Sequence, residues 1–186
     1  MNQYCTIQDM NYYKKEQFIA AVDKKGNILG PVEKWEAHKK GILHKAFSVT
    51  FQYKDMYVIQ HRKHPVFDGV FDLSCSSHQL MKNGKLELDT DAVLKTIKRE
   101  WKIDKSGITG KIQNIGVTYY KTKDENSKYI EHELCDQFLV KLKKLPAIHL
   151  EYAYGYSLVT EKELKNKRSR IWKNLAPWSK KAVELL

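Results

Sequence analysis

The segment Asp89–Trp101 (DTDAVLKTIKREW) decides how the rest of the sequence is interpreted, because it predicts one amphipathic helix in the middle of a chain of strands. Its apolar side chains recur at helical spacing and are Val93, Leu94, Ile97 and Trp101. Asp89 or Thr90 is expected to cap the first turn. Glu100 follows seven residues after Val93, so it is expected at the edge of the buried face of this helix.

Strands are predicted on both sides of this helix. Apolar runs separated by turn residues predict them at Phe18–Val22, Ile28–Gly30, Ala46–Tyr53, Met56–His61, Val70–Ser76, Ile112–Tyr120 and Glu133–Leu142. The first four form two hairpins, and Pro31 is expected to end the first hairpin.

Further helices are predicted nearer the two ends of the chain. One covers residues 32–40 and stops at Gly41, one begins with a capping box within residues 158–164, and the last begins at Pro177. This order of elements predicts a single domain with a mixed sheet between helices, an α/β or α+β fold.

Composition limits the class of protein. A chain of 186 residues with 42% hydrophobic and 30% charged residues is typical of one soluble globular domain. No apolar run approaches the roughly 20 residues that span a bilayer, and the first residues are too polar for a signal peptide, so we expect a cytoplasmic protein without a membrane span. The cysteines Cys5, Cys75 and Cys135 are odd in number and lack CxxC spacing, so we expect them to be reduced.

The charge is strongly basic. The chain has 33 Lys and Arg residues against 22 Asp and Glu residues, a formal net charge of +11. Such a balance attracts nucleic acid, anionic membranes or phosphorylated small molecules, or it solvates the surface with lysine. The basic residues are not interleaved with aromatic residues as on a nucleic-acid surface, so we expect no nucleic-acid partner.

Histidines and paired glutamates form the candidate metal site. Glu131 and Glu133 are two apart in a predicted strand, so their carboxylates point to the same face, whereas His132 points to the other face and is expected to be structural. A divalent ion coordinated also by imidazoles would relieve the repulsion between the two carboxylates. The alternative is an exposed strand whose acids face water. The candidate imidazoles are those of His38, His44 and His78.

A collinear set of short motifs resembles the type I isopentenyl-diphosphate isomerases of the Nudix superfamily. The motifs are EKWEAH (33–38), LHKAFS (43–48), QHR (60–62), DGVF (68–71), CSSH (75–78), DAV (91–93) leading to KRE (98–100), EHE (131–133) and APW (176–178). The resemblance covers about residues 16–186 and implies a Nudix-type α/β/α sandwich with a mixed sheet. Residues 1–15 are then an N-terminal extension.

The resemblance also implies ligands. A divalent ion (Mn²⁺, Zn²⁺ or Mg²⁺) would be held by His38, His44, His78, Glu131 and Glu133. Glu100 would help to hold a Mg²⁺ that bridges to the substrate diphosphate. The basic residues that would grip the diphosphate are Lys34, Arg62 and Lys63, with Lys95 and Lys98 as less direct matches. The expected partner is a small allylic or homoallylic diphosphate, and the protein is expected to be a monomer or a weak dimer.

The reaction implied by the resemblance moves a carbon–carbon double bond. An acid protonates the alkene, a carbocation-like species forms, and a base removes a proton from another carbon. Glu133 matches the acid side, with Tyr120, or less closely Tyr119, as its supporting hydroxyl. Trp178 matches the indole that stabilises the cation through its face, although a Trp at this position also fits simple packing of the last helix.

One departure from the family concerns the base. The family's catalytic cysteine stands two residues before the motif histidine, where this chain has Ser76, and Cys75 stands one residue too early. Neighbours in extended backbone point to opposite faces, so Cys75 would need a one-residue shift to take over. A serine hydroxyl is a far weaker acid than a thiol, which predicts a slowed isomerase or another proton acceptor. The run Asp72–Ser74 also departs from the family's usual sequence.

Two other functions stay open. A Nudix hydrolase would use a glycine followed by an Arg-Glu pair and further glutamates on one helix; Gly84 and Arg99–Glu100 fit, but Lys102–Asp104 follow where glutamates are needed. A diverged protein that binds a diphosphate without catalysis is the second alternative.

Overall fold

The structure is a computed structural model that describes residues 12–186, so Cys5 and most of the predicted extension lie outside the described residues. The strands are β1 (Phe18–Val22), β2 (Ile28–Glu33), β3 (His44–Tyr53), β4 (Met56–Arg62), β5 (Phe71–Asp72), β6 (Cys75–Ser77), β7 (Met81–Lys82), β8 (Lys85–Leu86), β9 (Ile108–Lys123), β10 (Ile130–Leu142) and β11 (Ala153–Thr160). The α-helices are α1 (Lys34–Lys40), α2 (Asp89–Trp101), α3 (Glu161–Lys165), α4 (Arg170–Asn174) and α5 (Pro177–Ala182). Three 3₁₀ turns are η1 (Tyr12–Lys14), η2 (Lys105–Gly107) and η3 (Val183–Leu185).

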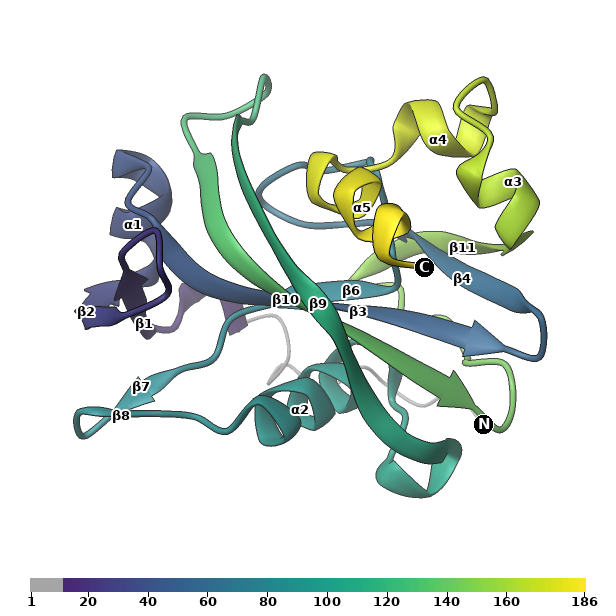
Figure 1. Cartoon of the computed structure of the whole chain (residues 1–186), viewed down its shortest axis with the longest axis horizontal. Coiled ribbons are helices and arrows are strands. Elements are labelled where there is room, and N and C mark those ends of the chain that lie inside the picture. Colours follow the sequence, from purple (N-terminus) through teal and green to yellow (C-terminus); the bar gives the residue numbers. More distant parts are fainter. Residues whose placement is uncertain (1–11) are drawn as a thin grey trace.

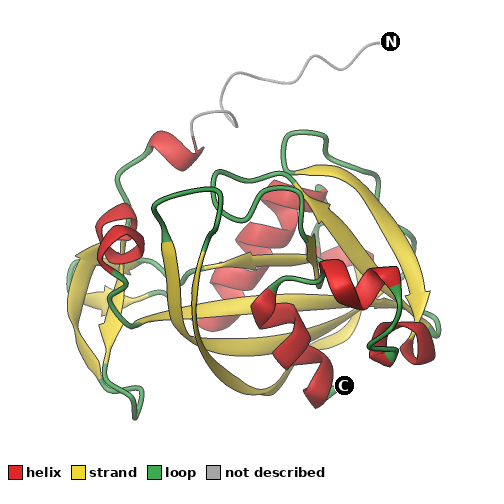
Figure 2. Cartoon of the chain, turned by 90° about the horizontal axis from the view of Figure 1, so that it is seen from above, coloured by secondary structure: helices red, strands yellow, loops and turns green. Residues whose placement is uncertain are grey.

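A mixed sheet forms the middle layer (Figure 1). Its main path runs β11-β4-β3-β1-β2, with β5 paired to β4, β6 paired to β3, and β10 paired to β3 and β9. Strand β10 pairs with β3 in parallel. The pairs of β10 with β9, of β11 with β4 and of β3 with β4 are antiparallel. Figure 2 shows the same layers from above, with helices on both sides of the strands.

Apolar side chains pack on both faces of the sheet. On one face Phe47, Val49 and Phe51 of β3 pack with Val93, Ile97 and Trp101 of α2. On the other face Tyr57 and Ile59 of β4 pack with Leu164 of α3, with Ala182 of α5 and with Leu175 between α4 and α5. Removing this apolar area from water is the main favourable contribution to folding. The predicted single-domain α+β sandwich with a mixed sheet is therefore confirmed.

Most helix-capping and helix-ending residues act at the positions predicted from the sequence. Gly41 ends α1 in the left-handed conformation (φ 61°), which glycine adopts without a Cβ clash. The Thr160 side chain and Glu163 form the predicted capping box of α3, and Pro177 occupies the first turn of α5.

Three local predictions were wrong. Strand β2 continues through Pro31 to Glu33, because β2 lies at the end of the strand order and the missing N–H of proline is tolerated at a sheet edge. The N-cap of α2 is Leu88, which makes no side-chain capping bond, while the carboxylate of Asp89 accepts a hydrogen bond from Gln79. The predicted strand 70–76 is interrupted at Ser74 (φ 67°), whose hydroxyl accepts from Phe51 N and donates to Val58 O.

No helix within residues 12–186 is long and apolar enough to cross a membrane.

Candidate active site

Strand register brings the candidate residues together. In the parallel pair of β3 and β10, His44 lies opposite Glu133, and in the antiparallel pair of β10 and β9, Glu133 lies opposite Tyr120. Side chains opposite each other in neighbouring strands share a face of the sheet, so three strands deliver these groups to one place. Ser76 lies opposite Ser48 in the pair of β6 and β3.

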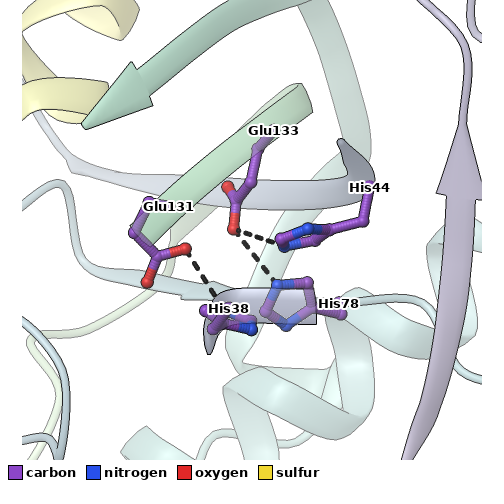
Figure 3. Close-up of side chains that lie close together, drawn as sticks. All are labelled: His38, His44, His78, Glu131 and Glu133. Carbon is purple, nitrogen blue, oxygen red and sulfur yellow. Dashed lines mark hydrogen bonds and ion pairs between the residues drawn. The ribbon is translucent and has the colours of Figure 1, made fainter. Parts of the chain in front are cut away.

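Three histidines and two glutamates meet on this face and are here called the His/Glu cluster: His38, His44, His78, Glu131 and Glu133 (Figure 3). One ligand atom from each lies within 4.8 Å of all the others. The Nε2 of His38 is 3.2 Å from Glu131 Oε2, and the Nε2 atoms of His44 and His78 are 3.4 and 3.1 Å from Glu133 Oε1. The five sequence-predicted ligands therefore converge on one point.

The second nitrogen of two rings orients them toward that point. His38 Nδ1 donates to Lys34 O at 2.6 Å, and His44 Nδ1 donates to Ile42 O at 2.7 Å, so each ring turns its Nε2 toward the centre of the cluster. Both His44 Nε2 and Glu131 Oε2 are buried and make no hydrogen bond with any residue from 12 to 186. Buried polar atoms are costly when unsatisfied, and a divalent ion with nitrogen and oxygen ligands would satisfy them. The residues therefore fit a divalent metal.

Burial and neighbouring charge set the protonation of the cluster. Burial acts to raise the pKa of Glu133, but the contacts with His44, Glu131 and Tyr120 together outweigh it and lower the pKa to about 2. Burial, followed by repulsion from the His44 and His38 rings, lowers the pKa of His78 well below its usual value. For His38, burial acts to lower the pKa, but Glu131 raises it above the usual value. Ionised carboxylates and neutral imidazoles are the forms that coordinate metals.

The two candidate tyrosines differ in position. Tyr120 is buried and its hydroxyl donates a short hydrogen bond to Glu133 Oε2. Burial, and then the nearby Glu133 carboxylate, raises the pKa of Tyr120 well above its usual value, so the phenol keeps its proton. Tyr119 is exposed on the other side of β9 and contacts His132 Nε2 instead. The structure therefore pairs Tyr120, and not Tyr119, with Glu133.

Ser76 and Cys75 point to opposite faces, as extended backbone requires. Ser76 lines the same pocket as Glu133, His78 and Trp178. Cys75 is fully buried among the apolar side chains that pack against α2. Burial raises the pKa of the Cys75 thiol well above its usual value. Cys75, named from the sequence as a second catalytic candidate, therefore lies outside the pocket.

The pocket carries several cations in its wall. Lys34 and Arg62 line it as predicted, and both are buried. Lys63 does not line it, because its ammonium turns outward to Leu150 O and the Tyr154 ring. Lys95 and Lys98 also lie outside this pocket, paired with Glu87 and Asp104.

Helix α2 adds two groups to the pocket. Glu100 is buried and accepts a hydrogen bond from Arg99 Nη2 at 2.8 Å. The guanidinium of Arg99 lies 3.8 Å from the centre of the Tyr12 ring. Glu100 was predicted as a ligand of Mg²⁺, but Arg99 was noted only within the KRE motif and for its hydrolase spacing, so its place in the pocket wall was missed.

Two residues of the predicted N-terminal extension also line the pocket. Turn η1 places the rings of Tyr12 and Tyr13 within 5.3 and 5.5 Å of the Lys34 ammonium, and Trp35 Nε1 donates to Tyr13 O at 3.0 Å. No motif marked these tyrosines, although a Tyr-Tyr pair beside basic residues is a signal for aromatic contact with cations.

The ring of Trp178 contacts both an aromatic and a cationic side chain. Its ring stacks on Tyr120 with centroids 5.9 Å apart, and Arg62 lies over the same ring at 5.4 Å. Its indole N–H donates to Asp72 Oδ1 at 2.8 Å. Trp178 thus both anchors α5 and presents its ring to the pocket.

Comparisons with known proteins find relatives by sequence and by fold. No protein-family model matches the chain. The chain is 32% identical over 141 residues to isopentenyl-diphosphate delta-isomerase 2 of Homo sapiens, covering 68% of this chain and 61% of that protein. It is 28% identical over 183 residues to isopentenyl-diphosphate Delta-isomerase 1 of Mesocricetus auratus, covering 88% and 79%. A protein of Clostridium acetobutylicum named as an uncharacterized Nudix hydrolase is 28% identical over 135 residues, covering 69% and 61%.

The fold has solved counterparts. The crystal structure of a MutT Nudix hydrolase from Burkholderia pseudomallei superposes with a TM-score of 0.56 at 16% identity, covering 77% of this chain and 98% of that one. This likeness establishes the Nudix fold. The chain spans about three fifths of the human relative. By sequence the chain is similar to isopentenyl-diphosphate isomerases, and by fold it is similar to proteins of the Nudix superfamily.

Proposed function

We propose that this protein is a metal-dependent isomerase that interconverts isopentenyl and dimethylallyl diphosphate. The observation that carries the proposal is that one pocket holds the His/Glu cluster, the Tyr120–Glu133 hydrogen bond and Ser76. An acid on one side and an acceptor on another are what a reaction needs that adds one proton to an alkene and removes another.

The diphosphate would be held by the cations of the pocket wall. Lys34, Arg62 and Arg99 are placed to contact its oxygens, and charged donors to phosphate are the stronger hydrogen bonds. Burial lowers the pKa of Lys34, and attraction by Tyr12 only partly offsets this, so an arriving anion would stabilise the charged ammonium. Glu100 would help to hold a Mg²⁺, which would supply positive charge for the diphosphate.

The protonation step would use Glu133 and Tyr120. A divalent ion bound by the His/Glu cluster would supply Lewis acidity that strengthens the acid beside it. The hydrogen bond between Tyr120 and Glu133 holds one proton, which is on the Tyr120 oxygen. Protonation of the alkene would pass that proton through Glu133 to the terminal CH₂, and solvent would later return a proton to the pair. The Trp178 ring would then face the positive charge that develops on the neighbouring carbon, an interaction of about 2 kcal/mol when desolvated.

Ser76 would stand on the side where the second proton leaves. It replaces the family's cysteine, and its hydroxyl faces the pocket while Cys75 faces the core. We therefore propose turnover slower than that of a cysteine-containing relative.

A Nudix hydrolase is the second candidate, favoured by the relative that bears that name. Hydrolysis would need several carboxylates on α2 to gather metal at the bond being broken. Among the described residues of α2, Glu100 is the carboxylate that lines the pocket, and the nearby Asp104 pairs with Lys98 on the surface. The isomerase is therefore the better supported function.

One incubation separates the candidates. Purified protein with isopentenyl diphosphate and Mg²⁺, with and without Mn²⁺, is followed for dimethylallyl diphosphate and for inorganic phosphate. Isomer without phosphate is the expected result. Phosphate without isomer would assign the hydrolase, and neither product together with tight diphosphate binding would assign the non-catalytic alternative.

A further inference from the structure

The carboxylate of Asp72 lies behind the pocket wall and is fully buried. It accepts hydrogen bonds from five described residues. Asp72 and these five residues are here called the Asp72 network. The donors to Oδ1 are Trp178 Nε1 at 2.8 Å, Ser179 Oγ at 2.7 Å and Leu73 N at 2.8 Å; those to Oδ2 are Ser76 Oγ at 2.8 Å and Arg62 Nη1 at 3.3 Å. Five donors around one buried carboxylate hold it in a single orientation.

The hydrogen bonds fix the direction of the Ser76 hydroxyl. An ionised carboxylate only accepts, so the Ser76 proton points at Asp72 Oδ2. Ser48 Oγ lies 3.0 Å from Ser76 Oγ, and because the Ser76 proton is already used, Ser48 donates in this contact. A hydroxyl oxygen accepts two hydrogen bonds, so one lone pair of Ser76 remains for the pocket that this residue lines.

We propose that Asp72 is the final proton acceptor of the isomerisation and that Ser76 passes the proton to it. This inference rests on the proposed function. The C–H bond at the carbon between the cationic centre and the CH₂–O group breaks, and its electron pair forms the new double bond. The proton moves to Ser76 Oγ while the hydroxyl proton of Ser76 moves to Asp72 Oδ2. Ser76 stays neutral, Asp72 becomes a carboxylic acid, and the reverse transfer to water after product release restores it.

The strength of the base is sufficient for this step. A C–H bond beside a cationic carbon is strongly acidic, so a carboxylate can accept its proton. Serine without a partner is far too weak for the same task. Arg62 lies against the oxygen that receives the proton and keeps its own charge for the diphosphate, so the relay leaves no buried charge without a partner.

A double-mutant cycle between positions 72 and 76 tests the relay. In Asp72→Asn the amide oxygen still accepts from Trp178 and Ser179, but the amide NH₂ cannot accept from Ser76. Asp72→Asn and Ser76→Ala should each lower kcat by about 10² or more, and together by no more than either alone. In Ser76→Cys the thiolate accepts the proton itself, so adding Asp72→Asn there should cost less than about tenfold.

The matched control is Asp124→Asn. Asp124 is also buried and accepts from Ser127 Oγ at 2.6 Å and Phe67 N at 3.1 Å, but it does not line the pocket. This variant should keep wild-type kcat with either Ser or Cys at position 76. An equal loss from Asp72→Asn in both backgrounds would show a structural role and overturn the relay.

A second measurement needs no change at Asp72. The relay moves the Ser76 O–H in the same step as the C–H, so the solvent deuterium isotope effect should be larger for the wild type than for Ser76→Cys. Equal isotope effects would overturn the relay. Wild-type protein that binds metal but forms no isomer would overturn the proposed function itself.

Discussion

The two polar sides of the pocket differ in how their atoms are satisfied. In the Asp72 network each carboxylate oxygen, the Ser76 hydroxyl and the Trp178 indole has a hydrogen-bond partner at 2.7–3.3 Å. In the His/Glu cluster, His44 Nε2, His78 Nδ1 and Glu131 Oε2 are buried without a hydrogen bond to any residue from 12 to 186. One side is complete as the chain folds, and the other is arranged for a ligand that the chain does not supply.

This difference predicts the largest effect at Glu133, where ligand binding and acid chemistry meet. Glu133→Gln removes the charge that contacts His44, His78 and Tyr120, and kcat for isomerisation should fall by about 10²–10⁴. The measurement is the initial rate with isopentenyl diphosphate at saturating metal. Glu36→Gln, an exposed glutamate paired with Lys40, is the control and should retain full rate; a Glu133→Gln rate within threefold of the wild type would refute the role of Glu133.

Metal binding at the His/Glu cluster should stabilise the folded protein, whereas the Asp72 network should not depend on metal. Mn²⁺ or Zn²⁺ at 100 times its dissociation constant should raise the free energy of unfolding by about 2.7 kcal/mol, and a chelator should reverse this. Thermal unfolding with and without metal measures the effect.

The control for metal binding uses two histidines. His38→Ala should lose most of the stabilisation by metal, because it removes a ligand of the cluster. His61→Ala should keep it, because His61 Nε2 binds Ser157 outside the pocket. Equal stabilisation of both variants would place the ion elsewhere.

At the Asp72 network, the reactivity of thiols tests which of positions 75 and 76 faces the pocket. Ser76→Cys should raise isomerase kcat by about tenfold, a fraction of what a matched general base contributes. It should also add one thiol that reacts with an alkylating reagent in the folded protein. Cys75 should stay unreactive until unfolding, because burial keeps its thiol protonated.

Cys75→Ala is the companion variant for this prediction. It should lower stability by about 1 kcal/mol by leaving a small cavity against α2, and it should keep isomerase activity. Loss of activity in Cys75→Ala without a gain in Ser76→Cys would show that the register is off by one residue.

The smallest effect is expected at the rim formed by turn η1. Tyr12→Ala removes the ring that covers Arg99 and Lys34, a contact of about 0.5–1 kcal/mol, so KM should change by about two- to fivefold with kcat unchanged. Tyr154→Ala is the matched control, because its ring lies against Lys63 outside the pocket. An equal change of KM in both variants would show that η1 has no specific role at the pocket.

From the sequence, all five members of the His/Glu cluster were predicted, and of the Asp72 network Ser76, Arg62 and Trp178 were predicted but not the carboxylate that joins them. Glu131 and Glu133 share a face by strand period, whereas His38, His44 and His78 were assigned as ligands through the resemblance to the family motifs. The Asp72 network depends on how β5, β6 and α5 approach one another, with contacts spanning up to 107 positions. Such contacts leave no periodic signal in the sequence.

Two other differences between the predictions from sequence and the structure also arise from contacts between residues far apart in the chain. The sequence pointed to Lys63, but the chain turns after β4 and sends that side chain to Leu150 O. Tyr12 reaches the pocket only because η1 packs beside α1 through the contact of Tyr13 with Trp35. The boundary of the N-terminal extension at residue 15 stays a prediction.

Proton NMR of the reaction in D₂O tests most directly the claim that the pocket adds one proton and removes another. With isopentenyl diphosphate, Mg²⁺ and the wild-type protein, we predict dimethylallyl diphosphate that carries deuterium in a methyl group, and no inorganic phosphate. Release of phosphate without isomer, or dimethylallyl diphosphate without deuterium from solvent, would contradict the account.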